Sequence, residues 1–232
     1  MKRRILAILL TICMVATLLP TAFAAEAVAK VGESSYETVQ AAVNAAEGGT
    51  VTLLKDTAED VAISGTVTLN LGGFKLTNAS GNTITVNKDA NLTIEGEGTV
   101  DNVTHGKAAI YNMGTVEIKG GTIERSAEAG VDASNSGGNS YYTILNHGTM
   151  TVQAGVTVNN KGRYSSLFEN GYFDYSKNRD GIDAPTLTIN GGLFDGGLNT
   201  IKNDDGASLT INNGTFKNYT QAAFMNHNIA TV

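Results

Sequence analysis

The sequence predicts an all-β chain wound as a parallel β-solenoid, in which successive coils stack their strands in register. A short motif recurs along the chain: an apolar residue, Thr or Glu, a second apolar residue, and then a turn that contains Gly. The five copies begin at Leu92, Val116, Met150, Leu187 and Leu209. Such short strands cannot bury an apolar face alone, so stacked coils have to close the interior together.

The composition favours the same fold. The 232 residues include 27 glycines, and only 16% are charged. Gly is a poor helix former, whereas Thr, frequent in the repeats, favours strands. The low charge argues against a chain kept unfolded by repulsion between like charges.

Residues 1–24 are expected to be a secretory signal. Lys2-Arg3-Arg4 is the positive start, Ile5 to Leu19 the apolar stretch, and Ala22-Phe23-Ala24 the small-residue cleavage site. The apolar stretch is short for a membrane span and ends at Pro20. We therefore expect an extracellular protein, either secreted or held at the cell surface.

Several function classes are excluded by what remains after cleavage. The only cysteine, Cys13, leaves with the signal, which excludes a disulfide scaffold, a thiol enzyme and a Cys-ligated zinc site. The formal net charge is −6 for the whole chain and becomes −9 once Lys2, Arg3 and Arg4 leave with the signal. This charge, with no Lys/Arg cluster, argues against nucleic-acid binding. No later apolar segment is long enough to predict a transmembrane span in the mature chain.

Residues 25–49 are expected to form an N-terminal segment with a capping helix. Ser34-Ser35-Tyr36-Glu37 reads as a capping box, and Gly48-Gly49 as the stop. Between them, apolar residues recur at helical spacing: Val39, Ala42, Val43 and Ala46. Such a helix would cover the open end of the apolar interior.

Residues 50–232 are expected to form the solenoid itself and to continue beyond Val232. Early strands are predicted at residues 51–54, 67–71 and 84–86 because apolar residues alternate there. A second, weaker motif ends in asparagine, at Asn112, Asn146, Asn203 and Asn226. Stacked asparagines can hydrogen-bond their side-chain amides from coil to coil, so an asparagine ladder is expected.

Three segments resemble a known family. They are residues 29–56, with Gly49-Thr50-Val51-Thr52-Leu53-Leu54; residues 69–76, Leu-Asn-Leu-Gly-Gly-Phe-Lys-Leu; and residues 187–194, Leu-Thr-Ile-Asn-Gly-Gly-Leu-Phe. They are similar to the pectin-lyase-like right-handed parallel β-helix regions of adhesin-like, exported surface proteins of Gram-positive gut bacteria. The resemblance implies a non-enzymatic, adhesin-like module whose partner is a polysaccharide or host glycan. Right-handedness also agrees with the usual hand of parallel crossovers.

Two long steps between repeats predict lateral loops, because insertions in solenoids project from one face. Residues 126–140 and 161–183 are the expected insertions, and aromatic residues lie within or beside them. Aromatic rings can stack on sugars, or they can pack on the solenoid wall and hold the loop down. The candidate ligand-binding residues are Tyr141, Tyr142, Tyr164, Tyr172 and Tyr175.

A polysaccharide hydrolase or lyase is the alternative. The segment at Asp180, the Asp204-Asp205 pair and His227 follow the order of a polygalacturonase site, which these segments resemble. Arg179 stands where that pattern has Thr, asparagines replace the glycines around His227, and no Arg-x-Lys follows. Solvated turn residues are the other interpretation of these positions.

A lyase would need calcium, and Asp180 and Asp183 are the candidate ligands. No other cofactor is expected. A third reading is a structural spacer within a larger surface protein.

Overall fold

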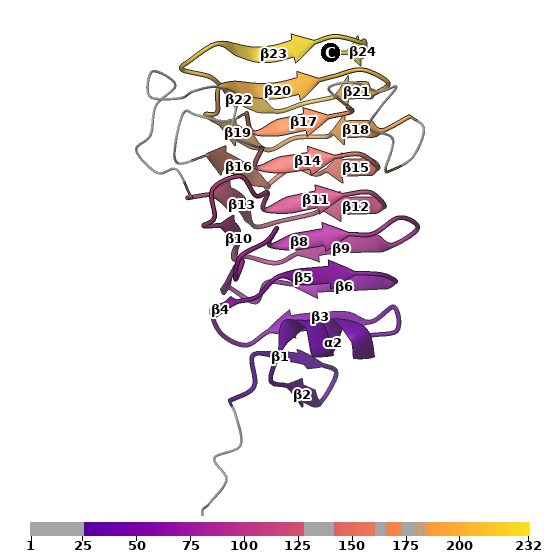
Figure 1. The fold of residues 1–232 in the computed structure, drawn as a ribbon, viewed down its shortest axis with the longest axis vertical. Coiled ribbons are helices and arrows are strands. Elements are labelled where there is room, and N and C mark those ends of the chain that lie inside the picture. Colours follow the sequence, from indigo (N-terminus) through magenta and orange to yellow (C-terminus); the bar gives the residue numbers. More distant parts are fainter. Residues whose placement is uncertain (1–25, 128–141, 161–165, 173–180, 182–183) are drawn as a thin grey trace, which may run out of the picture.

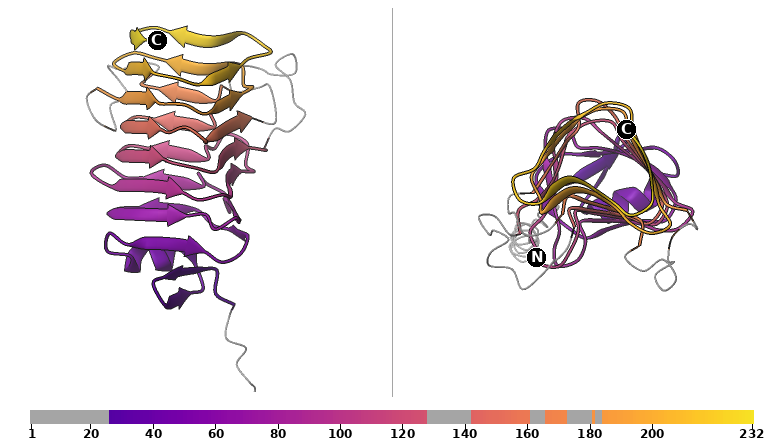
Figure 2. Two further views of the ribbon diagram at one scale, coloured as in Figure 1. Left: turned by 180° about the vertical axis from the view of Figure 1, so that it is seen from behind. Right: turned by 90° about the horizontal axis from the view of Figure 1, so that it is seen from above.

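The computed structural model describes residues 26–127, 142–160, 166–172, 181 and 184–232. These residues form a mostly β structure in which three sheets run the length of a solenoid-like stack (Figure 1). Each coil gives one strand to each sheet in turn. Seen from above, the coils superimpose as a rounded triangle (Figure 2). Within the described ranges, no helix is long and apolar enough to cross a membrane.

Sheet A has ten strands and carries the repeat that predicted the fold. From β3 onward its neighbouring strands are parallel, whereas β1 pairs antiparallel with both β2 and β3. In spatial order the strands are β2 (Ser34–Tyr36), β1 (Ala29–Val31), β3 (Thr50–Leu53), β6 (Thr66–Asn70), β9 (Asn91–Glu95), β12 (Thr115–Ile118), β15 (Thr149–Val152), β18 (Thr186–Ile189), β21 (Ser208–Ile211) and β24 (Ile229–Thr231).

Sheets B and C have seven parallel strands each. Sheet B contains β4 (Thr57–Ala58), β7 (Lys75–Thr77), β10 (Thr99–Asn102), β13 (Thr122–Arg125), β16 (Thr157–Asn160), β19 (Leu193–Asp195) and β22 (Thr215–Lys217). Sheet C contains β5 (Val61–Ile63), β8 (Ile84–Val86), β11 (Ile110–Asn112), β14 (Ile144–Asn146), β17 (Phe168–Asn170), β20 (Asn199–Asn203) and β23 (Ala222–Asn226).

The predicted apolar columns are confirmed by the strand register. The first apolar residues of the five repeats pair in order along sheet A, and all are at most 2% exposed. In sheet B, Phe194 lies between Val158 and Phe216 and stacks on Phe216 with ring centroids 4.8 Å apart. Burying aliphatic and aromatic side chains in register gives one continuous dry interior, which no single coil could provide.

The asparagine ladder is also confirmed, and it has one member more than predicted. Asn112, Asn146, Asn170, Asn203 and Asn226 follow one another, each Nδ2 donating to the next Oδ1 at 2.7 Å. Asn112, Asn146, Asn170 and Asn203 also donate to a backbone carbonyl oxygen at 3.0 Å. The ladder therefore satisfies buried amides and fixes the corner that follows sheet C.

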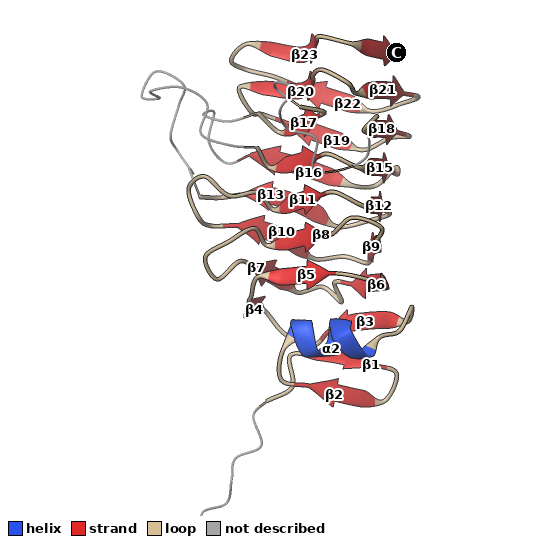
Figure 3. Ribbon diagram, turned by 45° about the vertical axis from the view of Figure 1, so that its right-hand side comes forward, coloured by secondary structure: helices blue, strands red, loops and turns tan. Residues whose placement is uncertain are grey.

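Helix α2 (Val39–Ala45) lies against β1, β2, β3 and β5, at the N-terminal end of the stack (Figure 3). The predicted capping box is wrong, because residues 34–36 form a strand and Thr38 caps the helix by accepting from the Ala41 N–H at 3.1 Å. The Glu59 carboxylate, from the first coil, accepts the N–H groups of Val39 and Gln40. A carboxylate at this position also suits the positive end of the helix dipole.

Segment 161–183 is not a single lateral insertion, as the sequence suggested. Phe168–Asn170 within it is strand β17, which pairs with β14 and β20 in sheet C. Phe168 is buried in the core, and Asn170 stands in the asparagine ladder. The long step between the repeats at Met150 and Leu187 is therefore one coil with extra residues on either side of β17.

Candidate functional site

The outward-facing side chains of sheet C form the first place where chemical groups gather. Strand pairing puts Tyr111, Leu145, Glu169, Lys202 and Met225 in one column, between the inward-facing residues of each strand. Outward positions of a solenoid normally meet solvent. Here Leu145, Glu169 and Lys202 are at most 8% exposed, so further parts of the chain cover this face.

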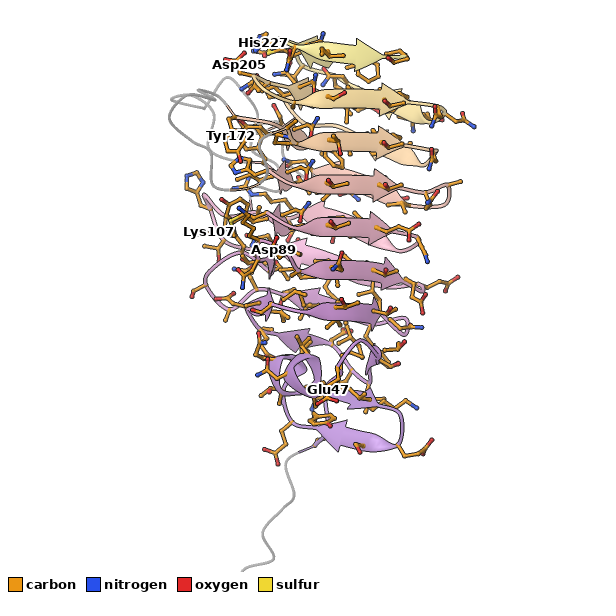
Figure 4. The ribbon with its side chains drawn as sticks, turned by 90° about the vertical axis from the view of Figure 1, so that its right-hand side faces the viewer. Glu47, Asp89, Lys107, Tyr172, Asp205 and His227 are labelled. Carbon is orange, nitrogen blue, oxygen red and sulfur yellow. The ribbon has the colours of Figure 1, made fainter. Side chains whose placement is uncertain are left out.

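Lys202 and Asp204 lie on that face, two residues apart in the chain, so their side chains project to the same side. The Lys202 Nζ is 2.5 Å from Asp204 Oδ2, and the side chains are 7% and 2% exposed. The other oxygen, Asp204 Oδ1, is 2.8 Å from His227 Nδ1, on the following coil. Figure 4 shows His227, Asp205 and Tyr172 along one edge of the stack.

Glu169 stands beside Lys202 on the neighbouring strand. Burial, together with the negative charge of Asp204, raises the pKa of the Glu169 carboxyl to about 8, although the Lys202 ammonium opposes the shift. The carboxyl shares hydrogen bonds with Tyr142 and Asp204. The Glu169 carboxyl therefore keeps its proton to a higher pH than an exposed carboxyl does, and in that form it can donate a hydrogen bond inside the cluster. We call Tyr142, Glu169, Lys202, Asp204 and His227 the Lys202 cluster.

An aromatic group adjoins this cluster. The His147 ring stacks on Tyr172 with centroids 4.2 Å apart, and its Nδ1 is 3.4 Å from the Tyr111 hydroxyl. The Tyr172 hydroxyl accepts the N–H of Gly181 at 2.7 Å. Tyr172, a candidate for stacking on a sugar, is fully buried, and its ring packs on His147.

The catalytic candidates of the hydrolase hypothesis come together only in part. Asp204 and His227 are in contact, whereas Asp205 is exposed and uses its backbone carbonyl to accept the Tyr172 N–H. Asp204 is not the solvated turn residue of the alternative interpretation, because it is 1% exposed and paired with Lys202. Tyr142, half-buried, contacts Lys202. Outside the described residues lie Asp180, Asp183, Tyr141, Tyr164 and Tyr175.

Two members of the cluster, Glu169 and Lys202, were missed from the sequence. Both occupy the middle position of the weaker repeat, in Phe168-Glu169-Asn170 and Ile201-Lys202-Asn203. A charged residue at a position that elsewhere holds Tyr, Leu or Met was the available signal. It could be used only after Phe168–Asn170 is identified as a strand of sheet C.

A second candidate site is a hollow of about 350 Å³ on the outer face of sheet B. It is lined by Thr157, Asn159, Asn160, Leu193 and Asp195, from β16 and β19, and we call it the sheet B hollow. The Oδ1 of Asn159 is buried and accepts no hydrogen bond from the residues that the structure describes. A buried acceptor without a partner costs free energy, and a donor from a ligand or water would relieve it.

A larger hollow, of about 600 Å³, lies where α2 meets the first coils. Its lining includes Glu47, Gly48 and Gly65, at the seam between the helix and the loops beside it. Among the described residues that line it, none has a buried side-chain atom left without a hydrogen bond. It therefore gives a weaker indication of a ligand than the sheet B hollow.

Metal ligands are not gathered in the part of the chain that the structure describes: no group of three or more His, Cys, Asp or Glu side chains could hold an ion there. The two calcium candidates, Asp180 and Asp183, lie outside that part.

Comparisons with known proteins identify no relative of this chain. No family model, no curated protein and no solved structure matches the chain.

Proposed function

We propose that this chain is a right-handed parallel β-helix with α2 as its N-terminal cap, acting outside the cell as a non-enzymatic, adhesin-like module that contacts carbohydrate. The sequence resemblance and the signal expected at residues 1–24 support export and this class of protein. The parallel stack and the position of α2 against β1, β3 and β5 support the capped helix.

The sheet B hollow is the observation that carries the carbohydrate contact. Its lining offers amide, hydroxyl and carboxylate groups around one apolar side chain, Leu193. Sugar hydroxyls need such donors and acceptors, and a sugar's C–H face can rest on an apolar group. The unpartnered Asn159 Oδ1 could accept from a sugar hydroxyl, which would remove an existing cost rather than add one.

A glycan array with the full chain, followed by calorimetry on each glycan retained, tests the proposal. Asp195→Ala is expected to weaken binding about tenfold or more, since a hydrogen bond to a charged group contributes roughly 1.5–3 kcal/mol. Glu117→Ala is the matched control on sheet A. Both carboxylates are 34% exposed and pair with a lysine, at 3.5 Å for Asp195 and 3.3 Å for Glu117. No retained glycan, or equal loss in both variants, would contradict the proposal.

Polysaccharide hydrolysis remains the second candidate because Asp204 and His227 are in contact. Inverting hydrolases keep their two carboxyls roughly 6.5–9.5 Å apart, with room for water between them. Asp204 and Glu169 instead share a hydrogen bond and are almost fully buried, which favours a structural role. If the full chain releases reducing ends from pectic polysaccharide and Asp204→Asn abolishes the release, the hydrolase hypothesis is supported. If the chain shows neither glycan binding nor hydrolysis, the remaining hypothesis is a structural spacer within a larger surface protein.

A further inference from the structure

The Lys202 cluster holds an amine and a carboxylate in contact, away from water. The Nζ of Lys202 is 2.5 Å from Asp204 Oδ2, an oxygen bonded to the carboxyl carbon. Both side chains are buried, and the Glu169 carboxyl lies against the same carboxylate. The ring of Tyr142 lies 5.8 Å from Nζ and covers one side of the amine.

Contact between the two groups and exclusion of water are two conditions that condensation of an amine with a carboxyl requires. In water an ammonium and a carboxylate stay apart as hydrated ions. Inside a protein, two reacting groups held at about 3–3.5 Å behave as if present at very high concentration. Burial also makes the two charges costly, so replacing them by a neutral amide removes a desolvation penalty.

We propose that Lys202 and Asp204 become joined by an isopeptide bond between Nζ and the Asp204 carboxyl carbon, with Glu169 as the proton shuttle. Glu169 gives its proton to one carboxylate oxygen, and the ammonium passes a proton back to Glu169. The Nζ lone pair then attacks the carbon, and the nitrogen passes one of its two remaining protons through Glu169 to the oxygen that is already protonated. The bond between that oxygen and the carbon breaks, and one water leaves. The ammonium and carboxylate supply every atom of the amide and the water, and no oxidant or metal is needed.

His227 has a place in the same step. Its Nδ1 lies 2.8 Å from Asp204 Oδ1 and, when it carries the proton, can donate to that oxygen. A hydrogen bond to this oxygen withdraws electron density from the carbon and stabilises the negative charge that develops during attack. In the product, the same oxygen becomes the amide carbonyl and keeps its partner.

A second lysine provides an internal contrast. Lys75 Nζ is 2.9 Å from Asp101 Oδ2 and 2.9 Å from Glu124 Oε1 on sheet B. Its side chain is 39% exposed, so the ammonium stays hydrated. We expect Lys75 to remain an ordinary ion pair, which makes it a negative control within the same molecule.

Peptide mapping of the folded, purified full chain tests the bond. Trypsin normally cuts after Arg179, Lys202 and Lys217. The isopeptide blocks cleavage after Lys202, so residues 180–217 should appear as one peptide lighter by one water. The peptides around Lys75 should have their unmodified masses. Cleavage after Lys202 with unmodified peptide masses would overturn the proposal, and this measurement needs no variant.

Variants show which residues lose the water, and they distinguish the isopeptide bond from a second reaction that also releases water nearby. Asp205-Gly206 could lose water by closing a succinimide. The isopeptide deficit should vanish in Lys202→Arg and persist in Asp205→Ser, whereas a succinimide would do the reverse and overturn the proposal. Glu169→Gln should slow formation about 100-fold or more, as loss of a general acid does. Formation at the wild-type rate in Glu169→Gln would refute the shuttle.

Discussion

Removal of one internal asparagine from the ladder should destabilise the fold far more than removal of the last one. Asn170 is fully buried, accepts from Asn146, and donates to Asn203 Oδ1 and to the Ser208 carbonyl. Asn170→Ala leaves three polar groups short of a partner: the buried side-chain amides of Asn146 and Asn203, and the part-buried carbonyl of Ser208. At about 1 kcal/mol or more for each group, the free energy of unfolding should fall by about 3 kcal/mol.

Asn226→Ala is the matched control at the other end of the ladder. Asn226 accepts from Asn203 at 2.7 Å in the same way, but it is exposed. Water can replace the lost acceptor there, so the loss should stay below about 1 kcal/mol. Urea unfolding followed by circular dichroism measures both variants, with the midpoint shifted and the slope unchanged. The reasoning holds that the corner is stabilised by hydrogen bonds between buried amides. Equal losses of unfolding free energy in Asn170→Ala and Asn226→Ala would refute it, because burial would then make no difference.

Three further effects should be measurable. Phe194→Ala empties a fully buried site in sheet B and should cost about 3–5 kcal/mol in urea unfolding; a loss below 1 kcal/mol would show that the column collapses onto the gap. Gly148→Ala should lower the thermal midpoint, because its Cβ would clash with the carbonyl oxygen of Gly114; an unchanged midpoint would mean that the corner backbone yields. Burial raises the pKa of Glu169 from 4.5 to about 8, so the folded chain keeps a proton that the unfolded chain loses across that range. Stability from this group is therefore complete below 4.5 and falls as pH rises to 8. The urea midpoint of the wild-type chain should therefore be lower at pH 8 than at pH 4.5, and Glu169→Gln should remove this difference. An equal difference in Glu169→Gln would mean that another group causes it.

The sheet A strands could be predicted in detail because their physics is local. Each copy of the repeat, such as Leu187-Thr188-Ile189, alternates apolar and polar residues and ends in a turn with Gly. The register then follows, since only one alignment stacks Leu187 on Met150 and Leu209. Helix α2 was predicted from its apolar spacing, but its cap was not, because Ser34–Tyr36 was free to pair with β1 as a strand.

The Lys202 cluster could not be predicted because it depends on the number of coils. With Phe168–Asn170 taken as part of a loop, Lys202 would stand beside Leu145, and the neighbouring strand would place no charge next to it. The strand β17 places Glu169 between them instead. The burial of Asp204 also depends on cover over the outer face of sheet C, which no local pattern reports.

The regular progression of the strands through the three sheets limits how a chain of this kind can change in length. If one whole coil were lost or gained, residues at equivalent positions of the remaining coils would still stack on one another, so every column would stay unbroken. Deletion of a single residue within a strand would turn its inward side chains to the solvent and its outward ones to the interior. Length variation among relatives of this protein should therefore come in complete coils, or else fall at the corners between sheets.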